Sequence, residues 1–212
     1  MQGIGEVCHG HDVWMHVDGA YGGAGLAAPS IREVFNGIEL AHSFIVDPHK
    51  WLFAPFDCCA LIYQDPRLAR EAHQQQGAYL EVVYDGVWNV SDYAHHLSRR
   101  ARGLPLWFSL ATHGTEAYAD AVEQTLAVAK EAAVRIERHP DLELVAEQNL
   151  SICVFRRKGW KPEDYANWSD HQLETGQSFV TPTKHNGETV LRFCIVNPRT
   201  TVQHIEEILA SL

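Results

Sequence analysis

The sequence predicts an α/β fold followed by a separate, smaller α+β unit. In the first hundred residues, short apolar runs alternate with a helix-like stretch, and a polar residue follows the first two runs directly. A long alanine-rich helical segment then precedes a second group of strands and helices. We therefore expect two domains, residues 1–103 and residues 104–212, with the boundary at Gly103.

The first domain is expected to contain three strands, at residues 13–17, 43–46 and 58–63. Residues 30–41 carry apolar side chains at helical spacing and predict one helix between the first two strands. Residues 65–102 are polar and show no periodicity, and a connection of that length is usually functional. The order strand, helix, strand, strand indicates part of an α/β sheet.

The second domain is expected to begin with a helix over residues 104–138, which is acidic early, basic late and closed by His139-Pro140. Apolar runs and helical spacing predict the elements that follow. The strands are expected at residues 142–146, 152–156 and 190–196, and the helices at residues 171–176 and 201–212.

Composition excludes several classes of partner. The formal net charge of −10 gives an acidic surface that repels phosphate backbones, so we expect no nucleic-acid partner. No apolar run approaches the ~20 residues that span a bilayer, so we expect no membrane partner. The five cysteines include no CxxC pair, which favours a reduced, cytoplasmic location. The thirteen histidines lack the spacing of a metal site, and no metal is expected.

Polar side chains follow the first two predicted strands, where ligands bind in α/β folds. Asp18 follows the first strand, and Asp47, His49 and Lys50 follow the second. Three apolar residues come directly after Lys50, in the string KWLF. Apolar surroundings disfavour an ammonium ion, so we expect a lowered pKa and a nucleophilic amine.

A nucleophilic lysine can form a Schiff base with an aldehyde cofactor, of which pyridoxal phosphate is the commonest. That cofactor needs a carboxylate against its ring nitrogen, and Asp18 is suitable. Ala20 is small enough for a flat ring to lie close by, and His49 and Ser43 are candidates for phosphate contacts. The alternative is that Asp18 and Lys50 form a structural ion pair. Cys58 and Cys59, in the run CCALIY, are expected as small core residues of a buried strand.

The strings HVDGAYGG (residues 16–23) and DPHKWL (residues 47–52) resemble the group II pyridoxal-phosphate-dependent decarboxylases, the family of aromatic-L-amino-acid decarboxylase. The similarity continues through FDCCALIY, AYLEVVYDG and VLRFCIVNPRTT, and so covers essentially the whole chain. It implies the later part of a fold-type-I large domain, followed by a small α+β domain. It also implies decarboxylation of an L-amino acid with pyridoxal 5'-phosphate as cofactor, and a homodimer. The DPHKW context favours an aromatic substrate.

The resemblance also implies roles for single residues. Lys50 would form the Schiff base, Asp18 would bind the ring nitrogen and Ala20 would pack on the ring. His49 would lie near the phosphate or assist proton movement. Asp47 stands where many relatives have asparagine, and it is expected among the cofactor-binding residues. Gly19 replaces a common alanine, which we interpret as a tolerated change between small residues.

Two further residues are expected to act on the substrate. Tyr79 lies in a stretch that resembles the family's mobile lid, where the tyrosine returns a proton to the substrate carbon, and a phenylalanine goes with aldehyde formation. Arg100, in SRRARG, is a candidate for the substrate carboxylate, and an interface ion pair is its alternative.

The chain begins abruptly, and we expect a fragment or truncated form of a longer protein. The alternatives are another fold-type-I enzyme, such as an aminotransferase or cysteine desulfurase, or a non-catalytic remnant acting as an interaction module.

Overall fold

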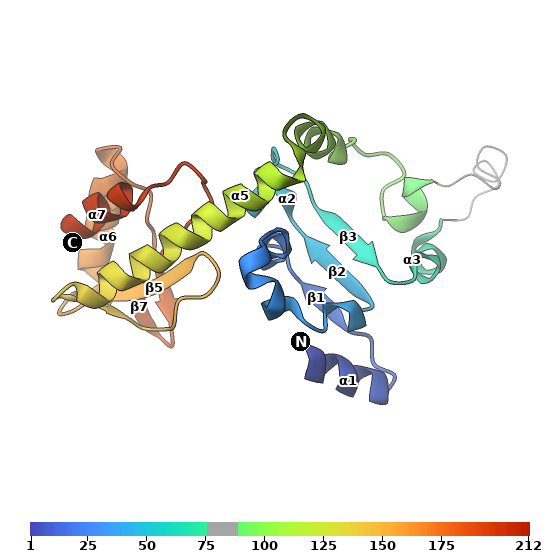
Figure 1. Ribbon diagram of the computed structural model, residues 1–212, viewed down its shortest axis with the longest axis horizontal. Coiled ribbons are helices and arrows are strands. Elements are labelled where there is room, and N and C mark those ends of the chain that lie inside the picture. Colours follow the sequence, from blue (N-terminus) through green and yellow to red (C-terminus); the bar gives the residue numbers. More distant parts are fainter. Residues whose placement is uncertain (76–88) are drawn as a thin grey trace. The chain divides into compact units, whose positions relative to one another are not determined.

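The computed structural model describes residues 1–75 and 89–212, which form two compact units, Met1–Gly114 and Thr115–Leu212 (Figure 1). Helix α5 (Gly103–Arg138) runs across the division. It is interrupted at Gly114, whose φ of 78° and ψ of 163° are not helical. The boundary expected at Gly103 is the first residue of this helix, and the compact units divide at its interruption.

The first unit contains a three-stranded sheet with β2 (Ser43–Val46) between β1 (His16–Asp18) and β3 (Ala60–Tyr63) (Figure 1). Strands β1 and β2 are parallel, whereas β3 is antiparallel to β2. The three expected strands are confirmed, although β1 and β3 begin later than predicted. The short helix α2 (Pro48–Trp51) follows β2 directly.

The single helix expected over residues 30–41 is wrong. Two 3-10 helices replace it, η2 (Pro29–Phe35) and η3 (Ile38–Leu40), and a third, η1 (Gly22–Ala27), precedes them. Gly37 interrupts the stretch with a φ of 91°, a left-handed conformation that favours glycine. A Cβ there would lie 2.4 Å from the backbone nitrogen of Gln2, the first residue of helix α1 (Gln2–Gly10). The chain therefore turns at Gly37 because the start of α1 packs against it.

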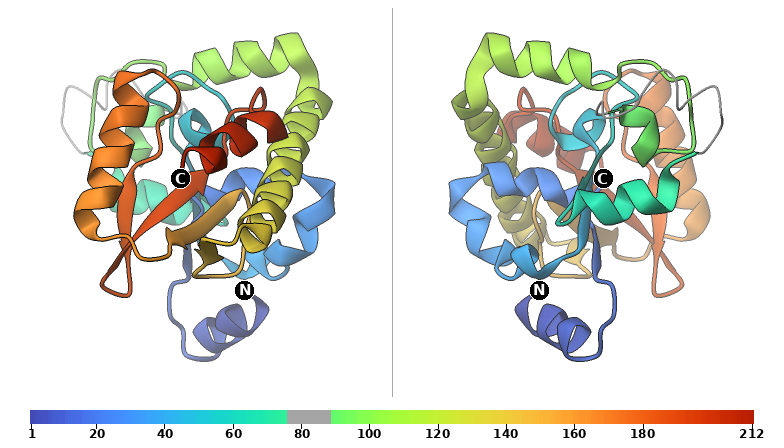
Figure 2. Two further views of the ribbon diagram at one scale, coloured as in Figure 1. Left: turned by 90° about the vertical axis from the view of Figure 1, so that its left-hand side faces the viewer. Right: turned by 90° about the vertical axis from the view of Figure 1, so that its right-hand side faces the viewer.

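Residues 65–102 contain more regular structure than the sequence pattern indicated. Asp65 is the N-cap residue of helix α3 (Pro66–His73), and its side chain accepts a hydrogen bond from the Arg67 backbone N–H. The 3-10 helix η4 (Val90–Tyr93) lies beside α3 (Figure 2), and Arg70 and Asp92 form an ion pair of 3.1 Å between them. The Asp-Pro start of α3 is an ordinary helix N-terminal signal that the expectation overlooked.

The second unit pairs a four-stranded antiparallel sheet with helices. The sheet order is β4-β5-β7-β6, and its strands are β4 (Leu142–Leu144), β5 (Ile152–Arg157), β6 (Pro182–His185) and β7 (Glu188–Cys194). Helices α6 (Pro162–Glu174) and α7 (Val202–Ala210) complete the unit. The expectation missed β6 and placed the start of α6 too late, because few apolar residues mark either segment.

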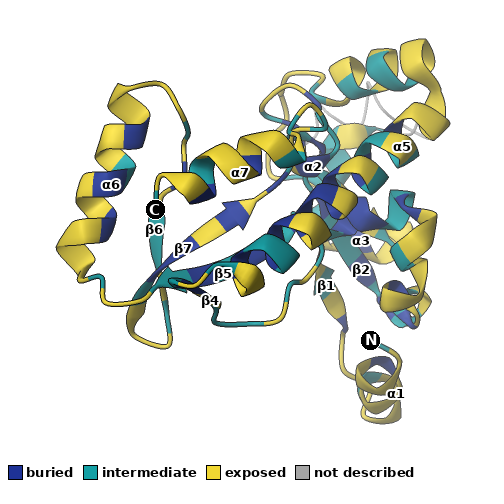
Figure 3. Ribbon diagram, turned by 60° about the vertical axis from the view of Figure 1, so that its left-hand side comes forward, coloured by how far each residue is buried: buried dark blue, intermediate teal, exposed yellow. Residues whose placement is uncertain are grey.

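The buried side chains of the second unit form one core between its helices and β5 and β7 (Figure 3). The α5 segment after Gly114 contributes fully buried residues, including Ile136. Phe155 on β5 and Phe193 on β7 contact each other with ring centroids 4.8 Å apart. Among the residues described, no helix combines the length and apolar character needed to cross a membrane.

Candidate active site

The carboxyl ends of β1 and β2 bring the two sequence motifs together. The strands run in parallel with Asp18 opposite Ile45, so the residues that follow them emerge at the same edge of the sheet. The Asp47 backbone N–H donates a 2.9 Å hydrogen bond to the Ala20 carbonyl oxygen. This bond joins the turn after β1 to the residue that begins DPHKW.

The turn after β1 passes close over β2. A Cβ on Gly19 would lie 2.4 Å from Cε2 of Phe44 and 2.8 Å from the Ile45 carbonyl oxygen, so this approach requires glycine. The Asp18 carboxylate accepts a 3.0 Å hydrogen bond from the Ala20 N–H and is held in a local turn. The site therefore presents an oriented carboxylate with a small side chain, Ala20, two residues away.

Helix α2 places Lys50 beside this turn. Asp47 is its N-cap residue, but the Asp47 side chain makes no capping hydrogen bond to α2 and so serves other partners. Trp51 is fully buried and stacks on Tyr21, with ring centroids 5.0 Å apart and planes 12° apart. This contact anchors α2 to the turn after β1, whereas 43% of the Lys50 side chain remains exposed.

The positive charge of Lys50 is stabilised by a neighbouring carboxylate. Its Nζ lies 2.8 Å from Oδ2 of Asp47. This hydrogen bond raises the pKa of Lys50, and the charge of Asp18 acts in the same direction. The lowered lysine pKa expected from the apolar string KWLF is wrong, because the hydrogen bond to Asp47 outweighs the opposing effect of burial.

Two neighbouring side chains lower the pKa of the Asp47 carboxylate. Burial by itself would raise its pKa, but hydrogen bonds from Lys50 and Cys59 lower it and leave the net pKa below the ordinary value. Cys59 is exposed and precedes β3, which corrects the expectation that it lies in a buried strand. Desolvation and the bond to Asp47 raise the pKa of the Cys59 thiol to about 11.

His49 is held by the neighbouring Cys58. Its Nδ1 lies 2.5 Å from the Cys58 carbonyl oxygen and 3.1 Å from the Cys58 nitrogen. The Cys58 N–H is the donor in the longer contact, so the Cys58 backbone fixes the orientation of the imidazole ring.

The structure therefore gathers Asp18, Ala20, Asp47, His49 and Lys50 at one sheet edge. Cys59 belongs to the same cluster and was missed by the sequence argument. Cys59 directly precedes β3, whose first residue, Ala60, pairs with Val46 at the end of β2.

Of the remaining candidates, Arg100 and Ser43 lie outside this cluster. Arg100 donates a 3.1 Å hydrogen bond to Asp57, and 78% of its side chain is exposed. Tyr79 lies outside the described residues. The suggestion that Ser43 reaches a phosphate is wrong, because Ser43 begins β2 and lies about 13 Å of extended chain from Asp47. Its hydroxyl instead contacts Trp14 and His16.

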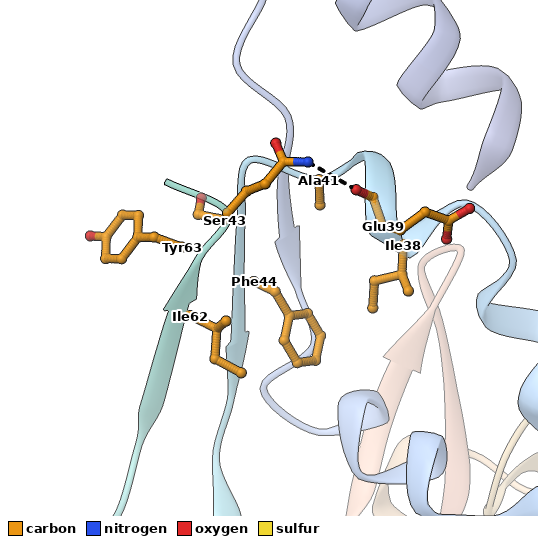
Figure 4. A pocket seen from close by; sticks show the side chains of 8 residues that line it. Ile38, Glu39, Ala41, Ser43, Phe44, Ile62 and Tyr63 are labelled. Carbon is orange, nitrogen blue, oxygen red and sulfur yellow. Dashed lines mark hydrogen bonds between the residues drawn. The ribbon is translucent and has the colours of Figure 1, made fainter. Parts of the chain in front are cut away.

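A pocket of about 260 Å³ lies at that other end of β2 (Figure 4). Phe44, Ile62 and Ile38 line it, and Gln64 closes one side through a 3.2 Å hydrogen bond to the Glu39 carbonyl oxygen. None of Asp18, Asp47, His49 and Lys50 lines this pocket, so it is separate from the cluster at the carboxyl ends of the strands. Within residues 1–75 and 89–212, no group of three or more histidine, cysteine or acidic side chains could hold a metal ion.

Comparison with known proteins identifies a matching family. Residues 1–158 match the model described as the pyridoxal-dependent decarboxylase conserved domain. The chain is 32% identical to aromatic-L-amino-acid decarboxylase of Sus scrofa, over 95% of this chain and 42% of that protein. It is 31% identical to 3,4-dihydroxyphenylacetaldehyde synthase of Aedes aegypti, over 92% of this chain and 38% of the relative. It thus spans less than half the length of these relatives.

Solved structures share the fold. Catharanthus roseus tryptophan decarboxylase in complex with L-tryptophan superposes with a TM-score of 0.83 and 26% identity, over 99% of this chain and 44% of that one. Oryza sativa TDC with PLP and tryptamine gives a TM-score of 0.87 at 25% identity, covering 99% and 46% respectively. The chain therefore has a partial fold-type-I architecture.

Proposed function

This chain belongs to the pyridoxal-dependent decarboxylase family, and from that membership we propose that it forms part of an enzyme that removes the α-carboxylate of an L-amino acid. The cofactor of the family is pyridoxal 5'-phosphate. The observation that carries the proposal is that Asp18 and Lys50 follow neighbouring parallel strands, whose ends are joined by the hydrogen bond from the Asp47 N–H to the Ala20 carbonyl oxygen.

The residues present fit this cofactor. A primary amine, a carboxylate held in a local turn and a small side chain occur at one edge of the sheet. In this assignment Lys50 would bind the aldehyde carbon, Asp18 the ring nitrogen and Ala20 the ring face. Asp47 belongs to the same group through its bond to Lys50. The cofactor, when bound, supplies a protonated ring that accepts the electrons left at the α-carbon as carbon dioxide departs.

The side chains of the protein would orient the cofactor and control where protons are held. The Asp18 carboxylate would favour a proton on the ring nitrogen. His49 would contact the phosphate or move a proton at the Lys50 amine. Because Asp47 stabilises the Lys50 ammonium, the amine must lose a proton before it can attack a carbonyl. Capture of the cofactor should therefore accelerate as the pH rises toward the raised pKa of Lys50.

We propose an aromatic L-amino acid as the substrate class and an amine as the product. Support for the substrate comes from the DPHKW context and from relatives named as aromatic-L-amino-acid, tyrosine and tryptophan decarboxylases. Support for the amine comes from the identity of Tyr79, which would protonate the substrate carbon. Arg100 is proposed to contact the substrate carboxylate, and the bond to Asp57 would then have to exchange. A homodimer and a cytoplasmic location complete the proposal.

The first test is covalent capture of pyridoxal phosphate by the 212-residue chain. We expect an absorbance band of the bound cofactor that borohydride converts into a stable adduct, mapped to Lys50 by peptide mass spectrometry. Lys50→Ala should abolish the adduct, whereas Lys130→Ala, at an exposed position of α5, should retain it. An adduct spread equally over several lysines would contradict the assignment.

The second test concerns the reaction. Carboxyl-labelled aromatic L-amino acids should release labelled carbon dioxide in the presence of the loaded chain, and L-glutamate should not. Release from neither class would limit the proposal to cofactor capture, and release from glutamate alone would reject the substrate class.

A further inference from the structure

The Asp57 side chain joins two segments of the first unit that lie 43 residues apart in the sequence. We propose that Asp57 is a positioning residue, whose carboxylate holds Arg100 and Arg102 beside the candidate site. This inference rests on the proposed function, in which Arg100 contacts the substrate carboxylate. It goes beyond that function because neither the motifs nor the chemistry of the cofactor assigns a role to Asp57.

Each oxygen of the Asp57 carboxylate binds a different arginine. Nη2 of Arg100 donates a 3.1 Å hydrogen bond to Oδ1, and Nε of Arg102 lies 3.0 Å from Oδ2. The Arg102 backbone N–H also donates a 2.8 Å hydrogen bond to the Arg100 carbonyl oxygen, which closes a tight three-residue turn. This turn lets both side chains reach one carboxylate, and charge-assisted bonds of this kind fix direction as well as distance.

The two arginines keep Asp57 ionised. The hydrogen bond from Arg102 and the charges of both guanidinium groups hold the pKa of the Asp57 carboxyl below its ordinary value. The carboxylate therefore carries its negative charge at neutral pH, and both ion pairs persist there.

The neighbours of Asp57 in the sequence place it at the candidate site. The Phe56 ring meets the His49 ring edge-on, with centroids 5.1 Å apart. The Cys58 N–H donates a 3.1 Å hydrogen bond to Nδ1 of the same imidazole. His49 directly precedes Lys50 in α2. Asp57 thus lies between two residues that hold His49, and the arginines bound to Asp57 are held next to the site.

The two arginines differ in exposure, and this difference divides their roles. The Arg102 side chain is 37% exposed, whereas the Arg100 side chain is 78% exposed. Exposed ion pairs contribute little to stability, so a second carboxylate can replace Asp57 at Arg100 at low cost. The pair of Asp57 with Arg102 then remains as the anchor and keeps Arg100 in place while its guanidinium binds the substrate.

The first measurement is the rate at which phenylglyoxal modifies single arginines of the cofactor-free chain, followed by peptide mass spectrometry. Asp57→Asn should accelerate modification of Arg100 and Arg102 about threefold, the size expected for loss of an exposed ion pair. Asp57→Glu retains the charge and should restore the wild-type rates. Asp65→Asn is the matched control, because it removes the carboxylate that binds Arg67 at 2.8 Å and should accelerate modification of Arg67 alone.

The second measurement separates positioning from a purely structural contact. In the chain loaded with pyridoxal phosphate, saturating L-tryptophan should slow the modification of Arg100, whereas tryptamine, which lacks the carboxylate, should not. Asp57→Asn should reduce this protection about threefold, and Asp57→Glu should recover it. An ion pair that only stabilises the fold would leave the protection unchanged in a folded variant.

The wild-type chain tests the same contact if Asp57→Asn does not fold. Raising the ionic strength from about 0.01 M to about 1 M shortens the Debye length from ~30 Å to ~3 Å and screens exposed ion pairs. Modification of Arg100 and Arg102 should then accelerate relative to N-acetylarginine in the same solution. Rates that stay constant for both residues would overturn the inference.

The inference and the proposed function fail in different ways. The inference fails if Asp57→Asn leaves the rates at Arg100 and Arg102 unchanged, or keeps the full tryptophan protection, while capture at Lys50 is intact. The proposed function fails if capture at Lys50 and tryptophan protection are both absent from the wild type, while Asp57→Asn still accelerates arginine modification.

Discussion

At Gly19, the lack of a Cβ allows the turn after β1 to lie close to β2. From the sequence, Gly19 was interpreted as interchangeable with alanine. In the structure, the turn after β1 lies so close to β2 that a Cβ would contact the Phe44 ring at 2.4 Å and the Ile45 carbonyl oxygen at 2.8 Å. The Phe44 ring could move aside, but the Ile45 carbonyl oxygen is part of the backbone of β2, the central strand, and cannot move without distorting the sheet. The close approach keeps Asp18 and Ala20 beside Asp47.

We therefore expect Gly19→Ala to destabilise the chain by about 1–3 kcal/mol, the usual cost of forcing an extra carbon into a packed site. Urea unfolding followed by circular dichroism would measure it. Gly3→Ala is the matched control, because a Cβ at Gly3 meets nothing within 4 Å. Identical midpoints for the two variants would show that the turn has room for alanine.

At the scale of elements, helix α5 contains a conformation that only glycine adopts readily. Gly114 interrupts the helix at a φ of 78° and a ψ of 163°, a region that is essentially restricted to glycine. The helical periodicity on both sides of it gave no sign of the interruption, since glycine also occurs inside continuous helices. The break is thus a property of the backbone that the amphipathic pattern does not reveal.

Gly114→Ala should lower the free energy of unfolding by about 1–3 kcal/mol, because an L-residue is strained at this φ and ψ. The comparison is Gly103→Ala, at the first residue of the same helix, where a Cβ meets nothing within 4 Å and φ is not positive. That variant should unfold within about 0.5 kcal/mol of the wild type. The prediction would be contradicted if Gly114→Ala were at least as stable as the wild type and showed a stronger helical circular dichroism signal. That result would mean that α5 becomes continuous through residue 114.

At the scale of the whole molecule, the second unit has a core of its own. Sixteen buried residues between Val128 and Leu209 form it. They come from the later part of α5, strands β4, β5 and β7, helices α6 and α7, and two residues outside these elements, Val180 and Ile195, all within Thr115–Leu212. A chain segment of this size with one continuous core can fold by itself.

Residues 115–212 expressed alone should therefore unfold cooperatively in urea. Within that segment, Phe155→Ala should cost about 3–5 kcal/mol, since Phe155 is fully buried against Phe193. Phe179→Ala should change stability little, because 76% of Phe179 is exposed. A broad, non-cooperative transition of the isolated segment would indicate that its core needs the first unit.

The sequence was sufficient for the parts of this protein that depend on local pattern and residue chemistry. Apolar runs identified β1, β2 and β3, and the acid after each of the first two strands, with Lys50 in DPHKW, indicated the edge of the sheet where the site would lie. Parallel strands carry the residues at their carboxyl ends to one edge, so these positions follow from order alone.

Contacts between distant segments required the tertiary structure. The close approach of the start of α1 to Gly37 depends on packing between distant segments. The meeting of the two motifs depends on the hydrogen bond from the Asp47 N–H to the Ala20 carbonyl oxygen, and the raised pKa of Lys50 depends on its hydrogen bond to Asp47. A linear sequence specifies side-chain chemistry, but hydrogen bonding and desolvation depend on neighbours that only folding brings together, and these decided the protonation and positioning of the lysine.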